Sequence, residues 1–166
     1  MKIVINAGHT KMGKGTGANA FLNESEETRK IAYELMKLLS LTKHEIIPCV
    51  IDKSDNYLKE VVDLTNKEKA DLFISIHLNA GKGKGTEVFT YKGNQHKEAL
   101  AICKNYEKLG FKNRGVKDGT QFYVVAKTTC KALLIEICFV DTESDVALYK
   151  QIGTYRLAKA IYDAIV

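Results

Sequence analysis

Short runs of apolar, mostly β-branched residues alternate along this chain with stretches whose apolar residues recur every three or four positions. The first pattern is typical of strands and the second of amphipathic helices. Their alternation indicates an α/β fold, in which helices cover the faces of a largely parallel sheet. The 166 residues suit one domain of this kind. We therefore expect a single α/β domain over residues 1–166, with a mostly parallel, twisted sheet of about six strands and helices on both faces.

The expected strands are short apolar runs bounded by polar or glycine-containing segments. They are Lys2–Ala7, His44–Ile51, Leu72–Ile76, Thr86–Tyr91, Gln121–Ala126 and Ala132–Phe139. Pro48, the only proline, lies inside the second run and favours an edge position or a bulge there. The polar segment Phe111–Thr120 is expected to be a loop.

Four regions carry the spacing of helices. The first is capped by Asn23 or Ser25, the second surrounds Val61 and ends near Ala70, the third is Asn94–Leu109, and the last opens at Thr142 or Ser144. The first turn of the first helix holds three glutamates, which suit the positive end of a helix dipole.

Composition excludes several classes of protein. The net charge is +5, but the lysines are scattered and form no basic stripe, so we expect no nucleic-acid binding. No apolar run approaches the roughly 20 residues of a membrane span, so no membrane insertion is expected. The apolar run Ile3–Ile5 is too short for a signal peptide, which predicts synthesis in the cytoplasm. The four cysteines form no C-x-x-C pair and are expected to be free.

Two histidines and a glutamate stand where an α/β sheet binds its ligands, beyond the carboxyl ends of strands. His9 follows the first strand, His77 ends the third, and Glu24 opens the first helix. Two imidazoles and one carboxylate, with a fourth position open to water, form the ligand set of a catalytic zinc site. The spacing alone is not diagnostic of such a site.

Glu136 lies in the otherwise apolar run Leu133–Val140. Burying a lone carboxylate costs several kcal/mol unless it is paired, hydrogen-bonded or protonated. Beside a metal and its water, Glu136 would serve as a general base. The alternative is a structural ion pair with a lysine such as Lys127.

Two further residues have open roles. Asn79 either caps the turn after His77 or hydrogen-bonds substrate. Cys138 stands two residues after Glu136 and would share its face of the strand, which leaves a thiol nucleophile as an alternative. No G-x-S-x-G elbow and no phosphate-binding G-x-x-x-x-G-K-[ST] loop occurs.

Four segments of the chain form a recognisable series of motifs, in this order: Lys2-Ile-Val-Ile-Asn-Ala-Gly-His9, Leu22-Asn-Glu24, Phe73-Ile-Ser-Ile-His77-Leu-Asn79 and Leu133-Leu-Ile-Glu136-Ile-Cys-Phe139. In these segments the chain resembles the zinc-dependent N-acetylmuramoyl-L-alanine amidases, the cell-wall amidases that include many phage endolysin catalytic domains. Gly85-Thr-Glu-Val-Phe89 and Asn113-Arg-Gly-Val116 are secondary matches. The match extends over essentially the whole chain.

The resemblance implies that His9, Glu24 and His77 bind one Zn²⁺ ion and that Glu136 is the catalytic carboxylate. It implies hydrolysis of the amide between N-acetylmuramic acid and L-alanine in bacterial peptidoglycan, and an endolysin-type domain. Where the family often has aspartate this chain has Asn6, which bears on the support of His9. Alternatives are a zinc carboxypeptidase-like peptidoglycan hydrolase and a non-catalytic wall-binding module.

Basic residues in loops are expected to border the substrate cleft, since stem peptides and wall polymers carry carboxylates and phosphates. These residues are Lys82, Lys84, Arg114 and Lys117. Among them, Arg114 is predicted to bind substrate together with Asn79.

Overall fold

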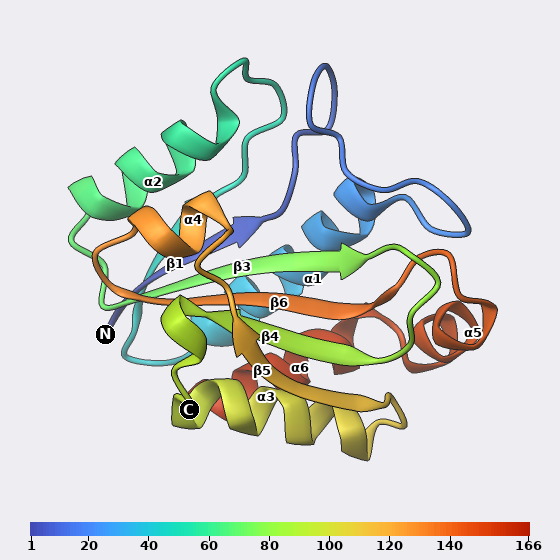
Figure 1. Ribbon diagram of the computed structural model, residues 1–166. Coiled ribbons are helices and arrows are strands. Elements are labelled where there is room, and N and C mark those ends of the chain that lie inside the picture. Colours follow the sequence, from blue (N-terminus) through green and yellow to red (C-terminus); the bar gives the residue numbers. More distant parts are fainter.

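A six-stranded sheet with helices on both faces forms the protein, as expected from the sequence (Figure 1). The computed structural model describes residues 1–166. The strands are β1 (Lys2–Ala7), β2 (Glu45–Cys49), β3 (Leu72–Asn79), β4 (Thr86–Thr90), β5 (Asn113–Asp118) and β6 (Lys131–Phe139). Their order across the sheet is β2-β1-β3-β6-β4-β5, and only the contact between β4 and β6 is antiparallel.

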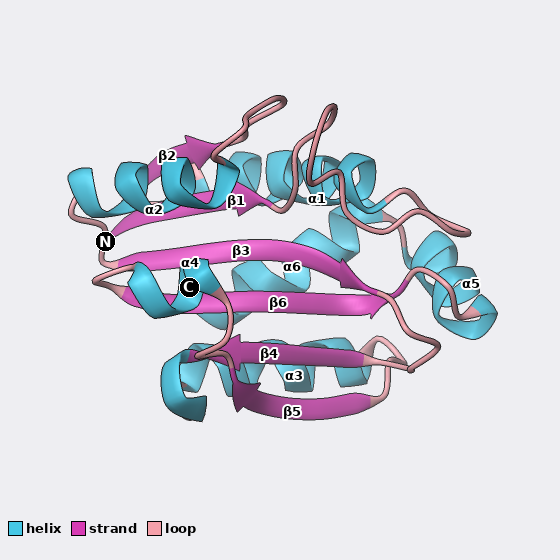
Figure 2. Cartoon of the chain, turned by 45° about the horizontal axis from the view of Figure 1, so that its top comes forward, coloured by secondary structure: helices cyan, strands magenta, loops and turns pink.

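The helices divide between the two faces of the sheet (Figure 2). They are α1 (Glu24–Leu39), α2 (Tyr57–Lys67), α3 (Lys97–Lys108), α4 (Tyr123–Lys127), α5 (Glu143–Ile152) and α6 (Thr154–Ile165), with a single 3₁₀ turn at Tyr91–Gly93. Helices α1, α3 and α6 cover one face over the larger apolar core, which includes 29 buried residues. Helices α2 and α4 cover the other face over a smaller core of nine buried residues.

Two of the predicted elements are wrong, and both lie between residues 111 and 127. Gln121–Ala126 was expected to be a strand but forms α4, because a short apolar run does not distinguish a strand from a buried helical turn. Phe111–Thr120 was expected to be a loop but contains β5. β5 is an edge strand held by its pairing with β4, and none of its residues is buried. Its sequence therefore shows no alternation of apolar and polar residues from which a strand could be predicted.

Two smaller expectations, about Pro48 and about the cysteines, are confirmed. The strand that contains Pro48, β2, lies at the edge of the sheet, where a missing N–H is tolerated. All four cysteines are free. None of the helices combines the length and the apolar character needed to cross a bilayer.

A register shift between β3 and β6 determines which residues reach each face. His77 pairs with Glu136, but Asn79 pairs with Phe139, so β6 contributes one extra residue at this point. A bulge of this kind turns the residues beyond it to the opposite face. Cys138 is therefore fully buried in the larger core and does not share the face of Glu136, contrary to the sequence prediction.

The central strand β6 should tolerate truncation of its core side chains poorly. Ile135 is fully buried, and Ile135→Ala should lower the free energy of unfolding by about 2–5 kcal/mol because it removes apolar contacts and leaves a cavity. Urea unfolding measures the change. Leu41→Ala is the matched control, since Leu41 is 84% exposed and its truncation should cost less than about 0.5 kcal/mol. Equal losses in the two variants would contradict this core assignment.

Candidate metal centre

His9, Glu24 and His77 meet at the carboxyl-terminal ends of β1 and β3, as the sequence predicted. Glu24 Oε1 lies 3.1 Å from His9 Nε2 and 3.1 Å from His77 Nδ1. One ligand atom from each residue lies within 4.8 Å of the others. Tetrahedral zinc with bonds of about 2.0–2.1 Å separates its ligand atoms by roughly 3.3 Å. The three side chains therefore fit a single metal ion with little rearrangement.

Backbone groups fix the orientation of Glu24. Asn23 caps α1 by accepting a hydrogen bond from the Glu26 N–H, which places Glu24 in the first turn. Its carboxylate is buried and accepts hydrogen bonds from the Leu78 N–H (3.1 Å) and the Ala18 N–H (2.8 Å). Because both donors belong to the backbone, the carboxylate is held in place independently of the histidines.

His9 reaches the site through an unusual backbone conformation. Its φ of 68° lies in the left-handed region, which is uncommon for residues with a Cβ, although histidine adopts it more often than most. The Nδ1 atom lies 3.0 Å from the Gly15 carbonyl, which can only accept, so His9 carries a proton on Nδ1 and directs Nε2 to Glu24. Gly17 is required beside it, since a Cβ there would lie 2.6 Å from Glu24 Oε2 and 2.7 Å from the His9 ring.

Arg29 supports the same loop and was missed by the sequence analysis. Its buried guanidinium donates to the carbonyls of His9 (3.2 Å) and Ile51 (3.0 Å) and pairs with Asp52. It thereby ties the backbone of His9 to the chain that follows β2. The signal was available, because Arg29 lies three residues before Ala32, on the buried stripe of α1.

His77 projects from β3 beside the end of β1. The Gly8 N–H donates to the Ile76 carbonyl (2.9 Å), which extends the pairing of these strands and brings His9 next to His77. His77 Nε2 lies 2.9 Å from Ser75 Oγ, and Ser75 donates to Asn6 Oδ1 at 2.8 Å. Asn6 therefore supports His77 through Ser75 and does not contact His9, which corrects the expectation drawn from the sequence.

The three groups shift one another's pKa values. Burial alone would raise the pKa of Glu24, but its hydrogen bonds with both histidines hold that pKa well below its usual range. Burial opposes the charge on His9, yet the hydrogen bond and charge of Glu24 outweigh it and raise the pKa of His9. Burial dominates for His77, whose pKa is lowered. The result is an ionised carboxylate between two imidazoles, which attracts a cation.

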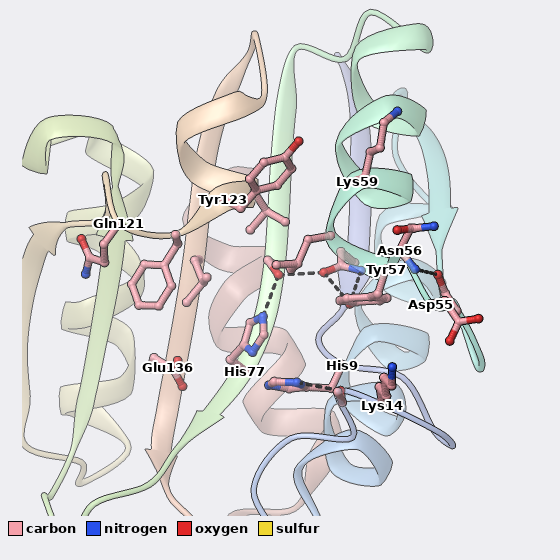
Figure 3. Close-up of a pocket in the computed structure, with 18 residues that line it drawn as sticks. His9, Lys14, Asp55, Asn56, Tyr57, Lys59, His77, Gln121, Tyr123 and Glu136 are labelled. Carbon is pink, nitrogen blue, oxygen red and sulfur yellow. Dashed lines mark hydrogen bonds between the residues drawn. The ribbon is translucent and has the colours of Figure 1, made fainter.

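Glu136 lies on β6 directly opposite His77 in the sheet register, with its side chain turned into the same cleft (Figure 3). Its Oε2 atom is buried without a hydrogen-bond partner, and the ion pair with Lys127 that sequence allowed is not formed. Burial, reinforced by the negative charges of Glu24 and Glu87, raises its pKa well above the ordinary value. An unpaired buried carboxylate beside three ligand atoms has the chemistry of a proton acceptor.

Asn79 and Arg114 lie next to this site but do not line its cleft. Both bind the buried carboxylate of Glu87, Asn79 through Nδ2 (2.8 Å) and Arg114 through Nε (2.8 Å). The guanidinium of Arg114 also stacks on the ring of Phe139 at 5.2 Å. Arg114 is thus already paired with a carboxylate. Asn79 also caps the turn that follows β3, because its Oδ1 accepts a hydrogen bond from the Ala80 N–H (2.9 Å).

A cleft of about 730 Å³ opens from the metal-site residues across the face covered by α2 and α4 (Figure 3). Its floor comes from strand residues such as Ser75 and Leu134, and its rim from the starts of α2 and α4, including Tyr57 and Tyr123. These rim residues were not predicted, and Tyr123 could not be, because α4 was expected to be a strand. The site is thus a cluster able to hold a metal ion, with an adjacent acid and an open cleft beside it.

Such an arrangement on an α/β sheet suits metal-assisted chemistry, and comparison with known proteins shows the family. The family model described as N-acetylmuramoyl-L-alanine amidase matches residues 3–166, and the chain belongs to this family.

Three similar proteins illustrate the relationship. An uncharacterized protein of Clostridium perfringens is 33% identical over 99% of this chain and 51% of its own length. The N-acetylmuramoyl-L-alanine amidase CwlM of Bacillus licheniformis is 31% identical over 87% of this chain and 59% of its own. The solved catalytic domain of the CD27L endolysin, which targets Clostridia difficile, is 31% identical with a TM-score of 0.87, over 99% of this chain and 96% of that domain. The chain thus spans about half the length of the curated relatives it matches first.

Metal binding at this cluster should weaken as the pH falls, since protons and metal compete for the same nitrogen atoms. The raised pKa of His9 means that His9 becomes protonated at a higher pH than an ordinary histidine, whose pKa is about 6.5. As the pH is lowered, zinc affinity, measured by competition with a chelator, should therefore begin to fall while the pH is still above about 6.5.

The profile of a variant carrying His44→Gln and His96→Gln should match that of the unaltered chain, because neither histidine belongs to the cluster. An affinity independent of pH between about 5 and 8 would contradict histidine ligation.

Proposed function

We propose that residues 1–166 are the catalytic domain of a zinc-dependent N-acetylmuramoyl-L-alanine amidase, which hydrolyses the amide between the lactyl group of muramic acid and L-alanine of the stem peptide. The observation that carries this proposal is the unpaired, buried carboxylate of Glu136 opposite His77 in a cluster of three metal ligands. Membership of the amidase family supports the choice of substrate.

His9, Glu24 and His77 would hold the zinc ion, since their nitrogen and carboxylate donors are the ligand set of catalytic zinc sites. When bound, zinc polarises the carbonyl of the susceptible amide and lowers the pKa of water from its bulk value to about 7. Only three protein ligands converge, which leaves a coordination position for water or substrate.

Glu136 supplies the proton transfers. Its carboxylate accepts a proton from the water as the water oxygen bonds to the amide carbon, and it returns that proton to the alanine nitrogen as the C–N bond breaks. Burial raises its pKa, which suits a group that must both accept and donate near neutral pH. A nearby divalent cation offsets part of this rise, since it favours the ionised form.

The cleft beside these residues accommodates a polymeric substrate. Its volume of about 730 Å³ and its open rim exceed the needs of a single amino acid. Lys14 and Lys59 line it and would attract the carboxylates of stem peptides. Arg114 keeps a different role, because its partner Glu87 already neutralises it.

We propose that the protein acts on the bacterial cell wall, since the similar proteins are named as cell-wall amidases and endolysins. The solved endolysin domain that is 31% identical covers almost the same length as this chain, which supports an endolysin-type catalytic domain. Peptidoglycan is therefore the proposed partner.

Digestion of purified walls tests the function. An amidase releases new alanine amino termini and leaves intact glycan strands with no new reducing ends. A carboxypeptidase would release free terminal amino acids, and a binding module would associate with walls and release nothing. Either of these two results would contradict the proposal.

Replacing Glu136 should reduce turnover strongly but leave metal binding intact. Glu136→Gln keeps the shape and removes the proton acceptor, so amino-group release should fall by about 10²–10⁴. Zinc content and the circular dichroism spectrum should stay unchanged. Glu26→Gln, at an exposed position of α1, is the matched control and should be fully active. Activity of Glu136→Gln near that of the control would refute the assigned role.

Removal of zinc by a chelator should inactivate the protein without unfolding it. The chain buries 55 of its 166 residues, most of them apolar, so its core does not depend on a metal. Far-ultraviolet circular dichroism should be retained, and zinc should restore activity. Cooperative loss of the spectrum on chelation would show instead that the metal is structural.

A further inference from the structure

A buried chain of polar groups links His77 on β3 to a backbone carbonyl on the edge strand β2, across the intervening strand β1. His77 Nε2 lies 2.9 Å from Ser75 Oγ, and Ser75 Oγ lies 2.8 Å from Asn6 Oδ1. Asn6 Nδ2 in turn donates to the Cys49 carbonyl (2.9 Å) and to Tyr57 Oη (3.0 Å). Ser75 is fully buried and Asn6 is 1% exposed, so water does not compete for these bonds.

The carbonyl at the far end fixes the direction of every bond in the chain. The oxygen of Cys49 can only accept, so the amide of Asn6 must present its NH₂ group there and its Oδ1 to Ser75. The single hydroxyl proton of Ser75 is then committed to Asn6. Ser75 Oγ can face His77 only as an acceptor, which requires a proton on His77 Nε2.

We propose that Ser75 and Asn6 are positioning residues that place the ring proton of His77 on Nε2 and keep the lone pair of Nδ1 for the metal. This inference rests on the proposed function, since it gives His77 the role of a zinc ligand. His77 Nδ1 is the atom that faces Glu24 Oε1 at 3.1 Å, whereas Nε2 points away from the cluster. The hydrogen bond thus selects the nitrogen that the geometry needs.

The opposite direction would be less well satisfied. If Ser75 donated to His77, then Asn6 Oδ1 would depend on the hydroxyl of Tyr57 at 3.3 Å. That hydroxyl would have to leave its shorter bond to the Ala7 carbonyl at 3.0 Å. A buried acceptor that loses its donor carries a penalty, so the first arrangement is favoured for Asn6 and Ser75. In that arrangement Nδ1 of His77 and Oε1 of Glu24 both present lone pairs, which a bound metal ion would satisfy.

The two histidines would consequently bind zinc through different nitrogen atoms. His9 donates from Nδ1 to the Gly15 carbonyl and offers Nε2, whereas His77 donates from Nε2 and offers Nδ1. For His9 the orienting backbone carbonyl, that of Gly15, contacts the ring directly. For His77 the orienting carbonyl, that of Cys49, acts through the side chains of Asn6 and Ser75. Partners of metal-binding histidines orient the ring and raise its basicity, and their loss typically weakens metal binding about 10–100-fold.

Zinc affinity of the Ser75→Ala variant tests the inference, with the dissociation constant measured by chelator competition. We expect weakening of about 10–100-fold. Thr65→Val is the matched control, because it removes another buried hydroxyl, whose bond to the Val61 carbonyl lies in α2 away from the cluster. Its dissociation constant should be that of the unaltered chain. An unchanged constant in Ser75→Ala, or equal weakening in both variants, would overturn the proposal.

A second measurement needs no change at Ser75 and applies even if Ser75→Ala fails to fold. Long-range ¹⁵N–¹H correlations of the zinc-loaded protein identify the metal-bound and the protonated nitrogen of each ligand ring. One ligand histidine should be bound through Nδ1 and the other through Nε2. Two rings bound through Nε2 would overturn the proposal. Zinc binding and amidase activity with that result would leave the proposed function intact, whereas an unaltered chain that binds no zinc would refute both.

Discussion

The site depends on one buried oxygen atom, Oε1 of Glu24, which contacts an imidazole nitrogen from each of two strand ends. Two backbone N–H groups fix this carboxylate, and the capped first turn of α1 positions it. The close packing of Gly8 and Gly17 around the rings leaves no room for a Cβ atom at either position. A carboxylate held in this way between two imidazoles attracts a divalent cation and offers it three ligand atoms, and the surrounding loops maintain that geometry.

The parallel sheet brings the remaining chemistry to the same place. Since β1, β3 and β6 run in the same direction, residues at their carboxyl ends share one edge, and the pairing of His77 with Glu136 puts an acid beside the ligands. The bulge that follows this pair turns Cys138 into the core, so the acid is left without a neighbouring thiol. The starts of helices α2 and α4 form the rim of the cleft beside this edge.

Much of this could be predicted from the sequence, since strand ends and buried charges leave clear patterns. His9 and His77 follow apolar strands, and Glu136 interrupts one. The supporting residues could not be predicted in the same way, because Ser75 and Asn6 are satisfied by groups that come together only through strand register. The two wrong predictions in residues 111–127, a loop where β5 forms and a strand where α4 forms, have a related cause. β5 is defined by its pairing with β4, and α4 by its packing on the smaller core.

Anomalous diffraction at the zinc edge from crystals of the zinc-loaded protein tests the central claim most directly. The account predicts one strong peak, within bonding distance of His9 Nε2, Glu24 and His77 Nδ1, with Glu136 close by but outside the coordination sphere. A peak elsewhere, or a carboxylate of Glu136 occupying the fourth position, would contradict it.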